Sequence, residues 1–141
     1  MQNRTKKLLV VDDDPIDAQF VIRAFSDVTE DLEVTHIADG DAAARCLSGE
    51  LFDYVLLDIN MPGTDGMELL KRIRTDKKTA VLPVIVLTSS MNPADVHLSY
   101  AQGANAYALK PSSLGGYRRF AEGFARFWID VAFHPYTPTP R

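Results

Sequence analysis

A short apolar run meets three carboxylates and a proline in Leu8-Leu9-Val10-Val11-Asp12-Asp13-Asp14-Pro15. Four consecutive apolar residues predict a strand that is buried on both faces of a sheet. Pro15 suits the first turn of a helix, and the apolar residues from Ile16 to Phe25 recur at helical spacing. We therefore expect a buried strand, an acidic turn and a helix, with Asp14 as the helix N-cap.

The same alternation of strand and helix continues along the chain. Further strands are predicted at 32–37, 53–58, 83–88 and 104–109, and helices at 42–47, at 67–73, from Pro93 and from Leu114 onward. Residues 61–66 are rich in turn residues and predict a loop. Strands that alternate with helices five times are typical of a doubly wound α/β fold with a parallel sheet. Right-handed crossovers bring the carboxyl ends of the strands to one edge, where ligands bind in such sheets.

Composition excludes several other classes of protein. The chain has 141 residues, enough for one domain, and 46% of them are hydrophobic. A net charge of −4 argues against nucleic acid as a partner, because binding to phosphates needs a basic face. The sequence has no run of 18 apolar residues, no signal-peptide pattern and one cysteine. We expect a soluble, cytoplasmic protein with no membrane span and no disulfide.

Chemically active side chains collect at the predicted carboxyl ends of the strands. Asp12 and Asp13 follow the first strand, and Asp58 ends the third. Thr88 ends the fourth strand, and Lys110 follows the fifth. Clustered carboxylates repel one another, and Mg²⁺ suits a site made of carboxylates, water and phosphate oxygens. A carboxylate in such a site can act as a nucleophile toward phosphorus, while an ammonium and a hydroxyl bind phosphate oxygens.

Four spaced motifs resemble those of response regulator receiver domains, which share the chemotaxis-type fold. The motifs are Val10-Val11-Asp12-Asp13-Asp14-Pro15, Leu56-Leu57-Asp58-Ile59-Asn60-Met61-Pro62-Gly63, Val86-Leu87-Thr88-Ser89 and Gly103-Ala104-Asn105-Ala106-Tyr107-Ala108-Leu109-Lys110-Pro111. The resemblance covers residues 6–130 and implies a flavodoxin-like sheet of five parallel strands in the order 2-1-3-4-5. It also implies a single receiver domain over residues 1–141, in which 131–141 form an extended C-terminal tail.

The resemblance implies a Mg²⁺ site and a phosphoacceptor at this edge. Asp58 would accept a phosphoryl group from a sensor histidine kinase. Asp13 would bind Mg²⁺ directly, and Asp12 would bind it through water. The backbone carbonyl of Asn60 and the Asp58 carboxylate would complete the protein's ligands.

The resemblance also implies a switch. Lys110 would contact the phosphoryl group, with a cis peptide before Pro111. Thr88 would move toward that group, and Tyr107 would turn inward behind it. A charge change at Asp58 would thereby reach the surface formed by the fourth helix, fifth strand and fifth helix.

The last predicted helix carries more aromatic residues than one buried face needs. The chain has seven of its 13 Phe, Tyr and Trp residues there, at positions 117, 120, 124, 127, 128, 133 and 136. They predict either a longer core or an exposed surface for a partner. Residues 127–135 resemble the tail of phytochrome-associated single-domain response regulators, which implies a phytochrome as the kinase and a homodimer. The implied interface includes Phe120, Phe124, Phe127 and Trp128, and the prolines at 135, 138 and 140 predict an extended or disordered terminus.

Two other classes of protein fit the sequence less well than a signalling receiver. A phosphatase-type hydrolase with an aspartate nucleophile would need a second aspartate two residues after Asp58, where this chain has Asn60. A receiver-shaped binding module would be expected to lack one of four residues, and the chain keeps Asp13, Asp58, Thr88 and Lys110. Because the chain stops soon after the fifth helix, we expect a switch that is not a metabolic enzyme, with no output domain of its own.

Overall fold

Five parallel strands form the central sheet, in the order β2-β1-β3-β6-β7. They are β1 (Lys6–Val11), β2 (Leu32–Ile37), β3 (Tyr54–Leu57), β6 (Val84–Thr88) and β7 (Ala106–Leu109). This computed structural model describes residues 5–61 and 64–136. Counted along the chain, these strands have the order 2-1-3-4-5, which confirms the predicted flavodoxin-like topology.

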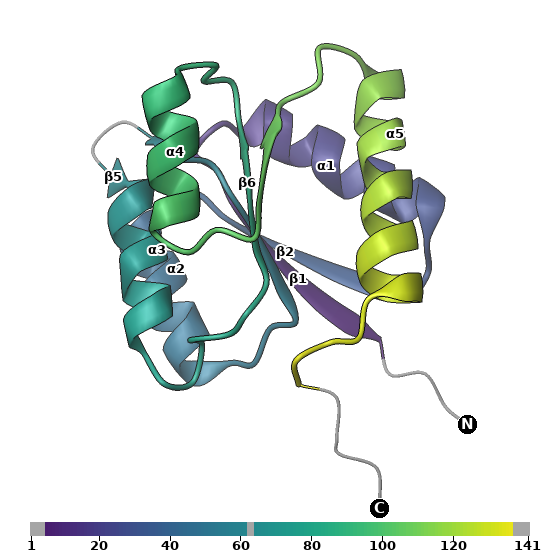
Figure 1. Ribbon diagram of the computed structural model, residues 1–141. Helices are drawn as coiled ribbons and strands as arrows, with labels where there is room; N and C mark the ends of the chain where they lie inside the picture. Colours follow the sequence, from purple (N-terminus) through teal and green to yellow (C-terminus); the bar gives the residue numbers. More distant parts are fainter. Residues whose placement is uncertain (1–4, 62–63, 137–141) are drawn as a thin grey trace, which may run out of the picture.

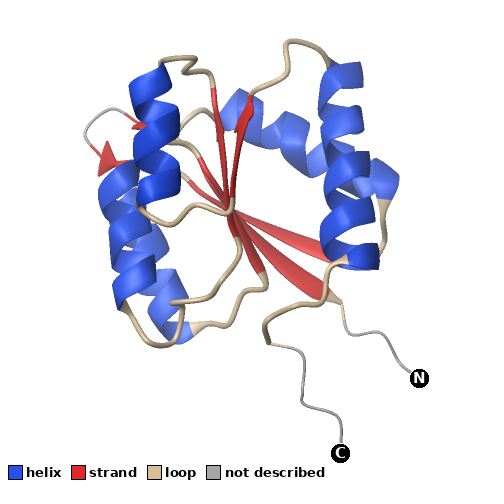
Figure 2. Ribbon diagram, in the orientation of Figure 1, coloured by secondary structure: helices blue, strands red, loops and turns tan. Residues whose placement is uncertain are grey.

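Helices cover both faces of the sheet (Figure 1). They are α1 (Pro15–Val28), α2 (Gly40–Gly49), α3 (Gly66–Thr75), α4 (Pro93–Ala101) and α5 (Leu114–Phe124), which continues as the π-helix η1 (Ala125–Val131). Figure 2 shows α1 and α5 on one side of the strands and the other three helices opposite. Among the described residues, no helix is long and apolar enough to cross a membrane.

Alternating side chains of the strands fill two separate hydrophobic clusters, one on each face. Leu9, Val11, Val55, Leu57, Val84 and Val86 pack on the α2 and α3 side. Leu8, Val10, Tyr54, Leu56, Ile85 and Leu87 pack on the α1 and α5 side. The central strands are therefore buried on both faces, which explains why their sequence is continuously apolar.

The strand register determines which residues lie together at the carboxyl-terminal edge of the sheet. Val11 pairs with Leu57, so Asp12 and Asp58 come next at the same edge. Thr88 pairs with Leu109, so Lys110 follows at that edge as well. The parallel pairing thus brings together side chains that lie far apart in the sequence.

Gly66 allows α3 to start directly against the backbone after β3. A Cβ atom at this position would lie 2.6 Å from Ile59 Cα and 2.7 Å from the Asp58 carbonyl oxygen. Any side chain would therefore push the helix and the Asp58 loop apart. The first residue of α3 helps to fix the backbone of Asp58.

The segment between β3 and α3 differs from the predicted loop. Asn60–Met61 (β4) and Thr64–Asp65 (β5) pair as a short antiparallel ladder. Pro62 and Gly63, part of the motif that contains Asp58, lie outside the described residues. Two-residue strands carry no periodic signal, so the turn residues there predict only an irregular loop.

The chain after η1 packs against the edge of the sheet opposite the strand ends that carry Asp12 and Asp58. His134 is 6% exposed, and its Nε2 lies 2.7 Å from the carbonyl oxygen of Asp53. Because a carbonyl only accepts, Nε2 donates, and Nδ1 accepts from the N–H of Tyr136 at 3.1 Å. The hydroxyl of Tyr136 donates to the carbonyl of Lys78. Residues 132–136 are thus anchored to the domain.

Candidate functional site

Three carboxylates meet at the carboxyl ends of β1 and β3. One oxygen each of Asp12, Asp13 and Asp58 lies within 4.8 Å of the others. Asp12 and Asp58 are buried, and Asp13 is the more accessible of the three. Such a cluster of like charges is costly unless cations offset it, so the site has the charge of a metal centre.

Both carboxylate oxygens of Asp58 have partners. Oδ1 accepts the N–H of Asn60 at 2.9 Å, and Oδ2 lies 2.8 Å from Lys110 Nζ. The backbone N–H of Asp58 donates to the carbonyl of Val11 at 2.9 Å. The side chain that was predicted to accept the phosphoryl group is therefore held in one orientation from two sides.

Lys110 is surrounded by three carboxylates. Its Nζ lies 2.9 Å from Asp12 Oδ2, 2.8 Å from Asp17 Oδ2 and 2.8 Å from Asp58 Oδ2. Burial alone would lower the pKa of Lys110, but hydrogen bonds to Asp17, Asp58 and Asp12 outweigh it and raise that pKa above its usual value. The ammonium is a fixed positive charge of the site.

Asp12 experiences opposing influences on its proton affinity. Burial raises the pKa of its carboxyl above the usual value, against the lowering effects of the Asp14 amide and of Lys110. The N–H of Asp14 donates to Asp12 Oδ1 at 2.9 Å, while the Asp14 side chain caps α1 as predicted. The acidic turn thus combines a helix cap with a buried carboxylate that a cation would stabilise.

Thr88 presents a buried hydroxyl at the same edge. Its side chain has no exposed area, and among the described residues Oγ1 has no hydrogen-bond partner. A buried hydroxyl without a partner costs about 1–3 kcal/mol, so such groups are rare in folded proteins. An oxygen of a bound phosphoryl group would satisfy it, so Lys110, Thr88 and the carboxylates fit both a phosphoryl group and a divalent cation.

Tyr107 is half-buried in the present arrangement. Its hydroxyl donates to the carbonyl of Ser90 at 2.8 Å, and its N–H donates to the Tyr100 hydroxyl at 3.1 Å. The expected cis peptide before Pro111 is wrong: no cis bond occurs in the described residues, which include this one. For an X–Pro bond the two isomers differ by only about 0.5–1 kcal/mol, so the sequence does not decide between them.

Asp17 belongs to the site, although sequence reasoning missed it. It is the third residue of α1, and its carboxylate reaches both Lys110 and the hydroxyl of Tyr117. An acidic residue in the first turn of a helix is explained by the helix dipole alone. The one available signal was its position on the same helix end as the acidic turn.

The residues predicted for a dimer interface divide between core and surface. Phe124 is buried against Phe25 and Tyr54, and Phe120 is half-buried. Trp128 is half-buried, and its backbone carbonyl accepts the Tyr54 hydroxyl at 3.0 Å. Phe124 therefore extends the core.

Three apolar side chains remain on the outside of this segment. Phe127 is 53% exposed, and Val131 and Phe133 are more exposed still. The aromatic surplus is thus divided between the core and an exposed surface, and a partner for that surface stays a prediction.

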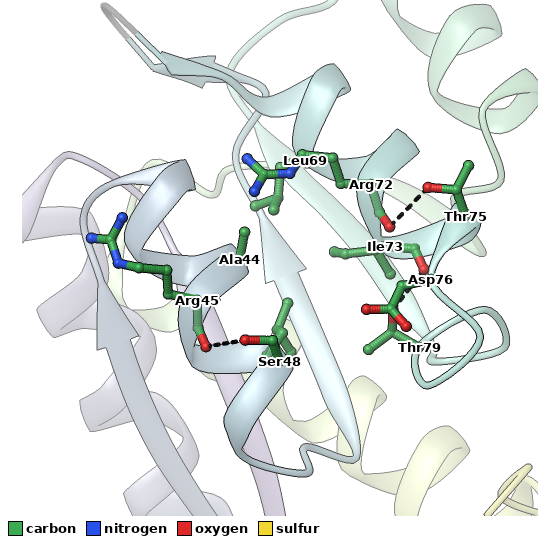
Figure 3. A pocket seen from close by; sticks show the side chains of 10 residues that line it. Ala44, Arg45, Ser48, Leu69, Arg72, Ile73, Thr75, Asp76 and Thr79 are labelled. Carbon is green, nitrogen blue, oxygen red and sulfur yellow. Dashed lines mark hydrogen bonds between the residues drawn. The ribbon is translucent and has the colours of Figure 1, made fainter.

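A separate pocket of about 380 Å³ lies between α2 and α3 (Figure 3). Arg45 and Ser48 line it from one helix, and Arg72 and Thr75 line it from the other. None of the acidic residues at the strand ends lines this pocket. The candidate site is therefore defined by its charges and contacts and is distinct from this cavity.

The comparisons with known proteins agree with the geometry of this edge. The family "Response regulator receiver domain" matches residues 8–117. The chain is similar to response regulator Rcp1 of Synechocystis sp., with 33% identity over 140 residues that cover 94% of this chain and 95% of the relative. It is also similar to chemotaxis protein CheY-3 of Vibrio cholerae, with 33% identity over 109 residues that cover 77% of this chain and 83% of that protein.

The chain is also similar to solved structures of response regulators. The Mn²⁺-bound form of Rcp1 has a TM-score of 0.83 and 31% identity, covering 92% of this chain and 99% of that one. The phosphorylated cyanobacterial phytochrome response regulator RcpA has a TM-score of 0.83 and 30% identity, and the match covers 92% of this chain and 98% of that one. The family match, the relatives and the sheet order agree, and this chain belongs to the response regulator receiver domain family of two-component signalling.

Proposed function

We propose that the chain is a single-domain response regulator that accepts a phosphoryl group on Asp58 from the phosphohistidine of a sensor histidine kinase, in a Mg²⁺-dependent reaction. The observation that carries the proposal is the contact between Asp58 Oδ2 and Lys110 Nζ, 2.8 Å, inside a cluster of carboxylates. One ammonium serves the three carboxylates of Asp12, Asp17 and Asp58. The remaining negative charge favours a divalent cation there.

The carboxylates of Asp12, Asp13 and Asp58 and the backbone carbonyl of Asn60 would hold Mg²⁺. The ion would supply positive charge that offsets the charge of the transferring phosphoryl group. Hard oxygen ligands in this number suit Mg²⁺ or Mn²⁺. Support comes from the similar protein Rcp1, for which a Mn²⁺-bound form is known.

The chain's own residues would position the reaction. An Asp58 carboxylate oxygen forms a bond to phosphorus as the P–N bond of the phosphohistidine breaks, and that electron pair returns to the imidazole. Lys110 binds one phosphoryl oxygen, and the Thr88 hydroxyl, buried without a partner among the described residues, donates to another. Tyr107 follows the movement of Thr88.

The partners follow from the same reasoning. Similarity to RcpA, a phytochrome response regulator, supports a phytochrome as the kinase. A homodimer through α4, β7 and α5 is supported by the exposed side chain of Phe127 beside this surface. With a net charge of −4, the domain has no excess positive charge for nucleic acid, and its output is binding between proteins.

Labelling with a small phosphodonor tests the proposal. Wild-type protein, incubated with acetyl phosphate and Mg²⁺, should gain the mass of one phosphoryl group, and Asp58→Asn should gain none. Asp14→Asn is the matched control, because asparagine also caps a helix and Asp14 lies outside the cluster. Full labelling of Asp58→Asn, or labelling that is independent of Mg²⁺, would refute the proposal.

A further inference from the structure

Asp17 connects the candidate phosphoacceptor site to α5. Its Oδ2 lies 2.8 Å from Lys110 Nζ, and its Oδ1 accepts the Tyr117 hydroxyl at 3.4 Å. Tyr117 is buried on α5, where its ring packs 5.4 Å from that of Phe20 on α1. Within the described part of the chain, Lys110 and Tyr117 are the side-chain partners of this carboxylate.

Three carboxylates compete for the ammonium of Lys110. An ammonium has three N–H donors, and three carboxylates surround this one. Phosphorylation converts the Asp58 carboxylate into an acyl oxygen that accepts hydrogen bonds more weakly, and the phosphoryl oxygens lie beyond it. Lys110 is thereby drawn toward these oxygens and away from the carboxylate of Asp12 or Asp17. The question is which of these two carboxylates is released at the lowest cost.

The solvent exposure of the side chains indicates that Asp17 is the carboxylate that is released. Its side chain is 26% exposed, whereas that of Asp12 is 6% exposed. A carboxylate that loses its partner must be solvated by water, which reaches Asp17 most easily. Asp17 is also outside the group of carboxylates that can hold a metal ion. Its bond to Lys110 is the one expected to break.

We propose that Asp17 is a positioning residue: it holds the Lys110 ammonium while Asp58 is unmodified, and its release is passed to α5 through Tyr117. This inference rests on the function proposed above. After release, the Tyr117 hydroxyl is the donor that remains for the Asp17 charge. Their contact of 3.4 Å exceeds the usual 2.5–3.0 Å of an O–H···O bond, so its shortening draws α5 toward α1.

Tyr117 is suited to this task as a neutral donor. Burial, followed by the charge of Asp17, raises its pKa to about 12, so the phenol keeps its proton at neutral pH. The route also differs in place from that of Thr88 and Tyr107. Tyr107 packs against the α2 and α3 cluster, whereas Tyr117 belongs to the α1 and α5 cluster. The two tyrosines therefore report on opposite faces of the sheet.

Trp128 provides a built-in reporter for movement of α5. It is the only tryptophan of the chain and lies in η1, which continues α5. Its ring is 6.5 Å from Phe124 and 5.0 Å from Phe127, so a shift of the helix changes its surroundings. Beryllofluoride, which stands in for the phosphoryl group on Asp58, can be titrated at saturating Mg²⁺ while Trp128 emission is recorded.

Three variants separate the steps. Tyr117→Phe removes one hydroxyl and keeps the ring, so the emission change should fall to less than half of wild type while the midpoint moves by less than about twofold. Asp17→Asn removes the charge that competes for Lys110. The beryllofluoride concentration at half-saturation should therefore fall by at least about threefold. Tyr136→Phe is the control, because it also removes one tyrosine hydroxyl, which donates to the Lys78 carbonyl on the α2 and α3 side, and it should keep the wild-type emission change.

Asp17→Glu is the rescue variant, since it restores the carboxylate and should return the midpoint toward wild type. A full emission change in Tyr117→Phe, or an unchanged midpoint in Asp17→Asn, would overturn the inference and leave the proposed function intact. No response of the wild-type protein to Mg²⁺ and beryllofluoride would overturn both. Circular dichroism of each variant confirms that the helices and the sheet are retained.

Discussion

The backbone N–H of Lys110 donates to the carbonyl oxygen of Thr88 at 2.8 Å, which continues the pairing of β7 with β6 by one residue. The ammonium and the buried hydroxyl are therefore placed by strand pairing and not by a free loop. Side-chain substitutions at either position leave this backbone bond intact. They can be interpreted as changes in the chemistry of the site.

Thr88→Val is expected to stabilise the protein and abolish its response. Valine has nearly the same shape and removes a buried hydroxyl that lacks a partner in the described residues. The free energy of unfolding should rise by about 1 kcal/mol in urea titrations. The response to beryllofluoride should be lost or strongly weakened. A decrease in stability would show that the hydroxyl is hydrogen-bonded in solution.

Lys110→Met should make stability depend strongly on Mg²⁺. The substitution leaves the buried carboxylates of Asp12 and Asp58 without their counter-charge, at a cost on the order of 3 kcal/mol. Urea unfolding should show that Mg²⁺ restores more stability in this variant than in wild type. The control is Arg72→Met, which breaks an exposed ion pair with Asp41 and should change stability by less than about 1 kcal/mol. Equal effects of Mg²⁺ on Lys110→Met and wild type would contradict the prediction.

Gly66→Ala should destabilise the protein by about 1–3 kcal/mol, because the new methyl group overlaps the backbone of Asp58 and Ile59. Gly123→Ala is the matched control. A Cβ at Gly123 meets nothing within 4 Å, so alanine should stabilise α5 by up to about 1 kcal/mol. Urea titrations of both variants measure the difference. A neutral Gly66→Ala would mean that α3 can move away from Asp58 without cost.

His134→Ala should cost about 2 kcal/mol, since it removes a buried ring that donates to the Asp53 carbonyl and packs 5.2 Å from the ring of Tyr54. Its neighbour Phe133 is 80% exposed, so Phe133→Ala should stay within about 0.5 kcal/mol of wild type. Thermal or urea unfolding compares the two. If both variants matched wild type, the end of the chain would not be anchored in solution.

Phe127→Ser should weaken self-association with little effect on folding. The side chain of Phe127 is half-exposed beside α5, whereas Trp128 also supports the core through Tyr54. Sedimentation velocity over a range of concentrations should show a larger monomer fraction for this variant. Leu51→Ser, at an exposed leucine outside α4, β7 and α5, is the control and should leave association unchanged. An unchanged mass for Phe127→Ser would argue against this interface.

The positions of the strand ends could be predicted from the sequence because each central strand is a continuous apolar run. Apolar runs locate β1, β3 and β6, and parallel pairing then places Asp12, Asp58 and Thr88 at one edge. No comparable rule applies to Asp17, whose reach depends on the angle at which α1 leaves the acidic turn. A sequence pattern also gives no orientation for a single side chain on a helix of the surface layer.

The end of the chain was the least predictable part. His134 follows exposed apolar residues and precedes Pro135, a context typical of a free terminus. Its burial depends on a contact with Asp53, 81 residues earlier in the chain. A long-range contact of a single polar residue leaves no periodic signal in the sequence. Such a contact can be recognised only in the folded structure, where the strands bring the two residues together.

The contact of His134 with the sheet has a practical consequence for experiments, because it places the end of the described chain near its start. The N–H of Asp53 donates to the carbonyl of Lys7 near the start of the described chain, so both described ends meet at one pole of the protein (Figure 1). The acidic cluster occupies the other pole. A protein immobilised on a sensor chip through either end should therefore present Asp58, the proposed phosphoacceptor, to the solution, which suits direct recording of docking by the proposed kinase.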